Sequence, residues 1–310
     1  MKRLDAIVAG EIYVDLIMSD FDVWPQPGRE SFARHFHREI GGGASITACA
    51  LAKLGSSAAV LGVVGAEPDS WIAESLRRNG VDPSWLEADP KEPTGFTVVA
   101  STPGDRAFLT YLGANRRFPE VLLQSAGSNW LSHARHVHLA FSPALDDAAA
   151  LFASVRRNEC TISLDVGWHE DWLRDPRALA LVAGIDIFFP NESEAAAMTG
   201  ESDPEKILQA FQQAGASAVA LKLGELGSAL LWNGQISRIA AHPVTPVDPT
   251  GAGDCFDAGF LHAWLKGEPP AVCLRTANIC GALSTEAHGG IAGVPSPRRL
   301  QEEVVRICGK

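Results

Sequence analysis

The segment Asp248-Pro249-Thr250-Gly251-Ala252-Gly253-Asp254 places a glycine-rich loop directly before a predicted helix at 253–265. Phe256, Phe260 and Trp264 recur at one-turn intervals over that helix, as expected of a buried helical face. Small residues let the backbone approach a ligand closely, and the first amides of a helix have no helical acceptor. The helix dipole also favours negative charge at this end. The segment therefore predicts a binding site for an anion such as a phosphate.

Asp254 puts a carboxylate into this anion-binding turn. A fixed negative charge beside a bound phosphate is unfavourable unless it has a task, and one task is to accept a proton from a hydroxyl that attacks the phosphate. The other interpretation is that Asp254 caps the helix, as aspartate often does. The segment alone leaves both interpretations open.

The composition of the chain limits the classes of partner. Its 310 residues carry a net charge of −11 without a basic stripe, which argues against nucleic acid and anionic membrane surfaces. The N-terminal apolar run is too short and too charged for a signal or spanning segment, and no other run reaches membrane length. The six cysteines lack paired short spacings, so we expect reduced thiols in a cytoplasmic protein that binds a small molecule. Two groups of histidines lack a metalloenzyme motif and predict no metal site: His35/His37 and His133/His136/His138.

Predicted strands and helices alternate after about residue 130. Four short apolar runs predict buried strands at 136–141, 160–165, 185–190 and 217–223. Helical periodicity follows these runs at 145–157, 170–183, 192–198 and 204–214. Further on, Asn233-Gly234 predicts a two-residue hairpin within 228–241, and helices are predicted at 253–265, 270–286 and 296–307. This alternation is typical of a mostly parallel sheet with helices on both faces.

The first 115 residues contain a second, smaller pattern. The run 4–10 predicts a buried strand, and it is followed by a helix at 46–54, a strand at 58–64 and a helix at 70–78. Alternation of apolar and polar residues predicts strands at 31–38, 94–101 and 106–112, with Pro103-Gly104-Asp105 as a hairpin turn. We therefore expect an α/β fold in one domain over residues 1–310, with a small β-sheet appendage.

Three further stretches place glycines or polar residues at the ends of predicted elements. Gly41-Gly42-Gly43-Ala44-Ser45 precedes a helix but matches neither a P-loop nor a dinucleotide fingerprint, so alone it is weak evidence for a ligand. The stretch Asn191 to Glu194 opens a helix after a strand, and it either holds hydrated Mg²⁺ and phosphate oxygens or caps the helix. The stretch Lys222 to Gly227 ends another strand, and it either borders a nucleotide or only turns the chain.

Three stretches together resemble the motifs of the ribokinase-like, or PfkB-type, carbohydrate kinase family. They are 248–254 followed by Ala258-Gly259-Phe260, the Gly41-Gly42 stretch with Gly55 after its helix, and Asn191 to Glu194. The resemblance covers nearly the whole chain and keeps the family's motif order. It implies a ribokinase-like α/β fold with a small β-sheet lid at roughly 12–40 and 94–115. It also implies transfer of the γ-phosphoryl group of ATP to a substrate hydroxyl, with Mg²⁺ as cofactor. Asp254 would then be the catalytic base, and the amides of Gly251, Ala252 and Gly253 would form the anion hole.

The resemblance implies roles for other residues as well. Substrate hydroxyls would be held by Asp15, Gly41 and Gly42, and metal and phosphates by Asn191 and Glu194. Nucleotide-site positions are matched by Lys222, Gly224, Gly227 and Asn278. A loop that binds a monovalent cation such as K⁺ in some members is matched by Asp248, Thr250, Ser284, Ala287 and Gly289. Members often dimerise through lid strands, which predicts a homodimer with a shared surface around Phe32, His35, Phe36, Phe96 and Val98.

Two positions depart from the family pattern on the substrate side. Ile46 stands where the glycine-rich motif usually has Asn, and Phe141 aligns with a Glu of ribokinase. A site built for hydroxyls loses selectivity when its polar partners vanish, which argues against ribose. The leading hypothesis is a kinase of a small sugar or polyol, for which Ser45, Arg106 and Asn115 are further candidate contacts. The alternatives are a nucleoside kinase and a catalytically silent nucleotide or sugar sensor, the latter disfavoured by the intact Asp254, Asn191 and Glu194.

Overall fold

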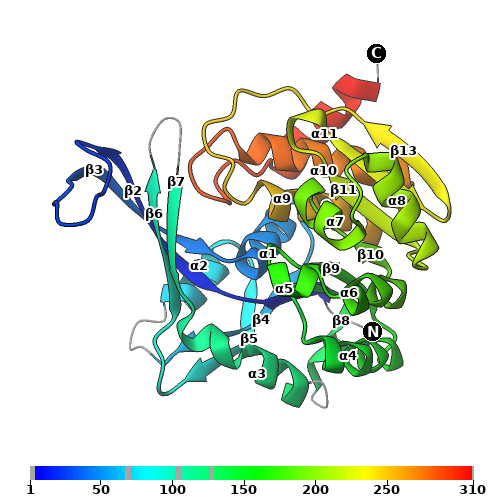
Figure 1. Cartoon of the computed structure of the whole chain (residues 1–310), viewed down its shortest axis with the longest axis horizontal. Helices are drawn as coiled ribbons and strands as arrows, with labels where there is room; N and C mark the ends of the chain where they lie inside the picture. The colour runs from blue at the N-terminus through cyan, green and yellow to red at the C-terminus, as the bar shows by residue number, and fades with distance from the viewer. Residues whose placement is uncertain (1–3, 67–70, 102–105, 126–128, 309–310) are drawn as a thin grey trace.

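The structure, a computed structural model, describes residues 4–66, 71–101, 106–125 and 129–308. It contains a nine-stranded sheet with the order β13-β12-β11-β10-β9-β8-β1-β4-β5 (Figure 1). The strands from β11 to β5 run parallel, and the β12–β13 hairpin adds two antiparallel strands at one edge. The nine strands are β1 (Leu4–Gly10), β4 (Ala58–Gly65), β5 (Asp82–Asp89), β8 (Ala134–Ala140), β9 (Thr161–Asp165), β10 (Ile187–Phe188), β11 (Ala218–Lys222), β12 (Ser228–Trp232) and β13 (Gln235–Ile239).

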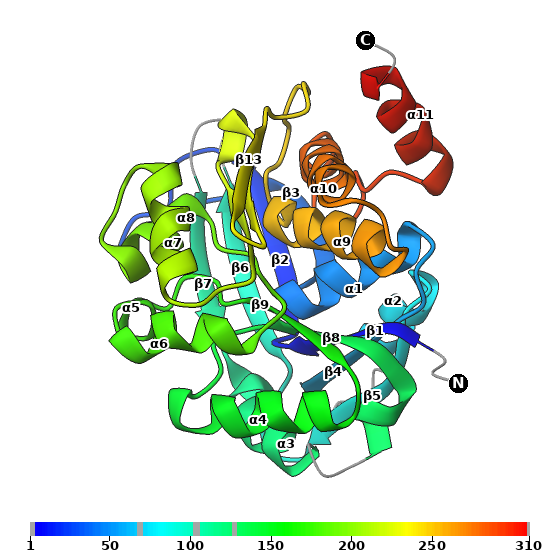
Figure 2. The ribbon, with the colours of Figure 1, turned by 90° about the vertical axis from the view of Figure 1, so that its right-hand side faces the viewer.

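Helices cover both faces of this sheet and form two apolar cores (Figure 2). Successive residues of β1 alternate between them, because side chains of a strand point to opposite faces. Ile7 and Ala9 enter one core, and Ala6 and Val8 enter the other. The first core contains α3 (Phe118–Ser125), α4 (Leu145–Arg157), α5 (Glu170–Leu173), α6 (Pro176–Leu181), α7 (Glu192–Thr199) and α8 (Pro204–Gln213). The second contains α1 (Gly43–Lys53), α2 (Trp71–Arg78), α9 (Ala252–Leu265), α10 (Pro270–Ser284) and α11 (Pro297–Cys308).

A separate four-stranded sheet, the lid, projects from one side of this body (Figure 1). Its order is β3-β2-β6-β7, formed by β2 (Tyr13–Phe21), β3 (Ala33–Gly41), β6 (Gly95–Ser101) and β7 (Arg106–Tyr111). Its inner face carries Ile17 and Val99, which line a small pocket together with Val247 and Asp248 of the body. The outer face carries Leu16, Val98 and Leu109, which are paired across the strands.

Most of the predicted elements are present, and the exceptions have local causes. The predicted helix 170–183 is divided into α5 and α6, because Asp175 caps a new helix whose first residue is Pro176. The strand predicted at 185–190 has only two residues, Ile187 and Phe188. Strands β2 and β5 and helix α3 were not predicted, and the Pro103-Gly104-Asp105 turn lies outside the described residues.

Short 3₁₀ helices complete the chain: η1 (Gly113–Arg117), η2 (Asn129–His133), η3 (Val182–Gly184) and η4 (Gly224–Leu226). Within the described residues, no helix combines the length and apolar character needed to cross a membrane.

Candidate active site

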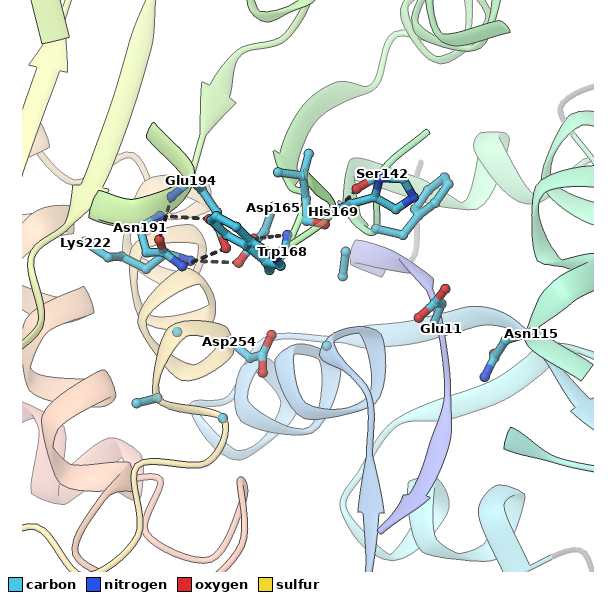
Figure 3. Close-up of a pocket in the computed structure, with 18 of the residues that line it drawn as sticks. Glu11, Asn115, Ser142, Asp165, Trp168, His169, Asn191, Glu194, Lys222 and Asp254 are labelled. Atoms are coloured by element: carbon cyan, nitrogen blue, oxygen red, sulfur yellow. Dashed lines mark hydrogen bonds and ion pairs between the residues drawn. The ribbon is translucent and has the colours of Figure 1, made fainter. Parts of the chain in front are cut away.

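A cavity of about 790 Å³ opens where the parallel strands of the large sheet end (Figure 3). Its polar wall comes from the carboxyl ends of successive strands, the usual ligand-binding edge of an open α/β sheet. The polar residues at these ends are Glu11 after β1, Ser142 after β8, Asp165 at the end of β9, Asn191 after β10 and Lys222 at the end of β11. The first turn of α9 closes the opposite side.

Asp254 lies in that first turn and points into the middle of the cavity (Figure 3). Asn191, Glu194, Lys222 and Asp165 lie on one side of it, and Glu11 and Asn115 on the other. Burial raises the pKa of Asp254 to about 7, the negative charge of Asp165 adds to the increase, and Lys222 opposes it. A carboxylate whose pKa lies near neutrality is suited to accept a proton.

The backbone before Asp254 forms an open turn. Gly251 adopts φ 71°, which only glycine reaches without strain. A β-carbon at this position would also lie 2.7 Å from Cα of Gly290. The amide of Ala252 donates to the Pro249 carbonyl at 3.2 Å. In the described part of the chain the amides of Gly251 and Gly253 have no acceptor, so these two are open to an anion.

Asn191 and Glu194 form the capping box that the sequence offered as one interpretation. The Asn191 side chain accepts from the Glu194 amide at 2.9 Å, and Glu194 accepts from the Asn191 amide at 2.9 Å and from its Nδ2 at 2.7 Å. Burial and the neighbouring Asp165 raise the pKa of Glu194 to about 7. The cap therefore holds a buried carboxylate at the cavity wall, and the two interpretations are compatible.

Lys222 forms an ion pair with two carboxylates. Its Nζ lies 2.7 Å from Asp165 Oδ2 and 3.3 Å from Asp257 Oδ1. Asp165 lines the cavity, while Asp257 is fully buried one turn after Asp254. A β-carbon at Gly253 would be 3.5 Å from Nζ, so the ammonium group lies beside the open turn.

On the acceptor side of Asp254, several polar groups are already engaged. Asn115 donates to the Ile12 carbonyl at 2.8 Å and accepts from its amide at 3.0 Å, which fixes the chain between β1 and β2. Glu11 accepts from the Tyr13 hydroxyl at 2.6 Å. Phe141 lines the cavity and packs edge-on against Phe118 with ring centroids 4.8 Å apart.

Asp15 and the glycines before α1 form the junction between lid and body. The Asp15 carboxylate packs directly over Gly41, where a β-carbon would collide with it. Burial and the charge of Glu39 raise the pKa of Asp15 to about 6. Gly42 adopts φ 89° as the N-cap of α1 and packs against the Glu11 carbonyl, so it too requires glycine.

Two other predicted substrate positions, Ser45 and Arg106, and the departing position Ile46 have different surroundings. Ser45 is fully buried in α1. Ile46 packs against Gly251 and Gly290, and it is not among the described residues that line the cavity. Arg106 begins β7, and its side chain lies outside the described part of the chain. The nonpolar side chain at position 46 therefore supports the glycine turn.

Of the predicted nucleotide positions, Lys222 and Gly224 line the cavity. Gly227 adopts φ 94° and packs against the backbone of Ile239 to Ala241. Asn278 donates to the carbonyls of Ile239 and Ala240, each at 3.4 Å. Gly227 and Asn278 thus both contact the segment that follows β13.

The predicted cation loop is held together by Asp248. Its carboxylate accepts from the Thr250 amide at 2.9 Å and from the Gly289 amide at 3.0 Å. Ser284 donates to the Gly281 carbonyl at 2.8 Å. The bond between Asp248 and Gly289 ties the turn before α9 to the loop after α10, which contains Ala287.

Glu11, Asp165 and Asp257 are candidate site residues that the sequence interpretation did not identify. Glu11 and Asp165 stand at the ends of predicted parallel strands, a position that the sequence could have revealed. Asp257 faces Lys222 only because α9 packs across the end of β11, a tertiary contact without a sequence signal. Within the described residues no group of three or more histidine, cysteine and acidic side chains is placed to hold a metal ion.

A family model described as pfkB family carbohydrate kinase matches residues 4–297. The chain belongs to this family. The 2-dehydro-3-deoxygluconokinase of Thermoproteus tenax is 28% identical over 89% of this chain and 88% of its own length. The nucleoside kinase of Methanothermobacter thermautotrophicus is 27% identical over 94% of this chain and 92% of its own length. The Arabidopsis thaliana ribokinase structure in complex with ribose and ATP has a TM-score of 0.82 and 26% identity, with 97% of this chain and 98% of that chain covered.

This membership confirms the predicted ribokinase-like fold and the predicted reaction class. As a member of the pfkB family, this protein is an ATP-dependent phosphotransferase with an alcohol group as acceptor.

Proposed function

We propose that this kinase phosphorylates a hydroxyl of a small sugar or sugar-like acceptor, with Asp254 as general base. The observation that carries this proposal is the position of Asp254, whose pKa is raised to about 7, beside the open amides of Gly251 and Gly253. The acceptor hydroxyl would lie between Asp254 and the Glu11 side of the cavity. ATP would lie on the side of Asn191, Lys222 and Gly224.

Phosphoryl transfer in this arrangement forms one bond and breaks one. The acceptor oxygen attacks the γ-phosphorus, the bond from that phosphorus to the bridging oxygen breaks, and ADP leaves with the electron pair. Asp254 accepts the hydroxyl proton as the new bond forms. The amides of Gly251 and Gly253 donate to the phosphoryl oxygens, whereas the amide of Ala252 donates to Pro249 and shapes the turn between them.

The donors around the cavity fit a hydrated Mg²⁺. Asn191 and Glu194 present oxygen atoms, which hard cations prefer, and the carboxylates of Asp165, Glu194 and Asp254 concentrate negative charge near one lysine, Lys222. Bound Mg²⁺ would supply positive charge to the phosphate oxygens. Asn191 and Glu194 are the residues that would hold it.

On the acceptor side we assign Asp15, Gly41, Gly42, Arg106 and Asn115 as substrate-binding positions, and we add Glu11. Ser45, which is fully buried in α1 and does not line the described cavity, would act only by packing α1 behind the acceptor. Asp15 and Glu11 supply carboxylates for hydroxyl recognition, whereas Asn115 acts by fixing Ile12. A nucleoside is the second candidate acceptor, because the aromatic side chains of Phe141 and Trp168 line the same cavity. On the nucleotide side, Gly227 and Asn278 would act by shaping the segment after β13.

Several broader proposals accompany this function. Residues 1–310 would act as one kinase unit, with its lid at roughly 12–40 and 94–115. The protein would work in the reducing cytoplasm, and two copies would form a homodimer through their lids. The five cysteines with described side chains are free and buried, which agrees with that compartment. The loop of Asp248, Thr250, Ser284, Ala287 and Gly289 would bind a monovalent cation such as K⁺ and thereby order the anion hole.

An acceptor panel measured by ADP release tests the proposal. The panel contains 2-dehydro-3-deoxygluconate, fructose, ribose, adenosine, inosine and cytidine, each with ATP and Mg²⁺ and with or without K⁺. Turnover with a sugar acid or ketose supports the leading proposal, and turnover with nucleosides alone replaces the acceptor. Asp254→Asn provides the blank, and we expect turnover about 10²–10⁴-fold lower while ATP binding by calorimetry survives. Nucleotide binding without turnover on any acceptor would instead indicate a sensor.

A further inference from the structure

A line of buried polar side chains runs beneath the phosphoryl side of the cavity. It starts at Lys222 and passes through Asp257 on α9 to His138 on β8 and Ser163 on β9. Asp257 and His138 are both fully buried. Placing an ionisable group in an apolar core is unfavourable, so a buried carboxylate without a role would be disfavoured.

The helix itself has no need of Asp257. The side chain lies on the buried face of α9 between Phe256 and Ala258, where an apolar residue would pack. Its Oδ1 contacts Lys222 Nζ at 3.3 Å, and its Oδ2 has no hydrogen-bond partner in the described part of the chain. Burial raises the pKa of Asp257 well above its usual range, and the contact with Lys222 opposes this rise.

The two carboxylates that hold Lys222 come from different elements, Asp165 from the end of β9 and Asp257 from α9. Asp165 lies at the cavity wall, as does Lys222 itself. Asp257 lies behind the wall, so the second contact draws Nζ toward α9. Nζ consequently lies beside Gly253, within 3.5 Å of where a β-carbon would stand.

His138 limits the motion of Asp257 from the opposite side. Its Nε2 lies 4.0 Å from Asp257 Oδ2, and its Nδ1 is bonded to Ser163 Oγ at 2.8 Å. Ser163 Oγ is also 2.8 Å from Nε2 of His136, which fixes the hydroxyl in turn. Burial lowers the pKa of His138 to about 4, so the imidazole is neutral at pH 7 and does not compete with Lys222 for Asp257.

We infer that Asp257 is a positioning residue, which holds the Lys222 ammonium group beside the Gly253 turn so that it contacts the γ-phosphoryl group of bound ATP. This inference rests on the proposed function of the turn and goes beyond it. It assigns a role to a residue that does not line the cavity. It also predicts that Asp257 acts only through Lys222.

Binding of two nucleotides tests the inference without an acceptor. ADP and the non-hydrolysable ATP analogue AMP-PNP are titrated calorimetrically, with Mg²⁺, into the full-length protein and into Asp257→Asn. We expect AMP-PNP affinity to fall about tenfold in Asp257→Asn while ADP affinity changes less than about twofold, because only the γ-phosphoryl group reaches Lys222. Equal losses for both nucleotides, or none, would overturn the inference.

A double-mutant cycle separates Asp257 from Lys222. Lys222→Met should lose at least as much AMP-PNP affinity as Asp257→Asn, and the double variant should bind like Lys222→Met alone. Losses that multiply in the double variant would show that Asp257 acts independently, against the inference. Should Lys222→Met bind AMP-PNP as the unchanged protein does, Lys222 does not contact the γ-phosphoryl group and the inference fails, while turnover on the acceptor panel still tests the kinase proposal.

Two further variants separate positioning from folding. His262→Gln, a buried residue of α9 that is bonded to Ser56 and lies outside the polar line, should lower Tm but leave the AMP-PNP to ADP affinity ratio unchanged. If Asp257→Asn does not fold, Asp257→Leu replaces it, because buried ion pairs often tolerate apolar residues of similar volume. The same selective loss of AMP-PNP affinity is expected there, and its absence in folded protein contradicts the inference.

Discussion

The carboxylate of Asp254 packs against the backbone of Gly43, so that a β-carbon at position 43 would lie 2.9 Å from Oδ1. Gly43 is the first residue of α1 and has no positive φ, so alanine suits its backbone. We expect Gly43→Ala to keep or raise Tm, because the flexible carboxylate can rotate away. The same rotation misplaces the base and should lower kcat about 10–100-fold. Steady-state kinetics measure the expected fall in kcat, and a thermal melt measures Tm. An unchanged kcat would contradict the placement of Asp254.

The raised pKa of Asp254 predicts the pH dependence of activity. Only the ionised carboxylate accepts a proton, so kcat/KM should rise with pH and level off above about 7. Asp165 contributes to this pKa through its negative charge. Asp165→Asn should therefore move the acidic limb to lower pH, and an unmoved limb in that variant would argue against this electrostatic coupling.

The raised pKa of Asp254 also makes the stability of the fold depend on pH. Stability should fall as pH rises, whereas activity should increase. The carboxyl of Asp254 titrates near 3.8 when unfolded and near 7 when folded, so its protonated form stabilises the fold at low pH and this contribution is lost as pH rises through 7. Asp254→Asn mimics the protonated form. Its gain in Tm should be larger at pH 8 than at pH 5, by roughly 2–4 °C. A gain that is equal at both pH values would show that burial of Asp254 does not raise its pKa.

Gly251 and Gly200 form a matched pair for the glycine turn. Both adopt φ above +70°, but a β-carbon at Gly251 meets the Gly290 backbone at 2.7 Å, while at Gly200 no atom of the described residues lies within 4 Å. Each alanine variant carries the left-handed strain, about 1–2 kcal/mol, and Gly251→Ala adds the collision, about 1–3 kcal/mol more. Chemical denaturation measures this difference, and equal losses would mean that the turn yields without strain.

The sheet and its flanking helices were predictable because each element has a local pattern that agrees with its tertiary role. Asn233-Gly234 forms the expected turn between β12 and β13, and α4 has the predicted bounds Leu145–Arg157. Strand β2 was missed because it belongs to the lid, where most of its residues are only half-buried and its periodicity is weak. Helix α3 was missed although its buried residues Phe118, Val121 and Leu122 have the i, i+3, i+4 spacing of a helical face, because its eight residues contain only one such repeat.

The site also contains residues that the sequence could predict and residues that it could not. Asp254 and the Asn191–Glu194 cap could be predicted because each lies at the junction of two elements, which the sequence shows. The partners of Lys222 could not be predicted, because Asp165 and Asp257 reach it from two different elements across 57 and 35 residues of sequence. Such contacts depend on how helices pack on a sheet, which local pattern does not specify.

Ile46 was interpreted as a missing polar contact to the acceptor, and its packing leads to a different expectation. The side chain is 4% exposed and contacts Gly251 and Gly290. Ile46→Asn should lower the free energy of unfolding by about 2–5 kcal/mol without creating ribose phosphorylation. Ile46→Val is the control, with an expected loss of about 0.5–1.5 kcal/mol. New ribokinase activity in a stable Ile46→Asn variant would place this residue at the acceptor after all.

The two faces of the lid predict where a second copy of the chain would bind. Leu109 is 63% exposed on the outer face, in line with Val98 and Leu16, whereas Phe108 is 59% exposed on the inner face beside Val99. An apolar sheet face of this kind is typical of a protein–protein interface.

The sequence interpretation assigned Phe36 and His35 to one shared surface. The lid register separates them, because Phe36 pairs with Met18 on the outer face and His35 lines the inner pocket. We therefore expect a dimer at micromolar concentration that Leu109→Glu dissociates and Phe108→Glu does not, as measured by sedimentation velocity. A monomeric unchanged protein, or dissociation by Phe108→Glu alone, would exclude the outer face as the interface, because burying an unpaired Glu at a true contact is strongly unfavourable.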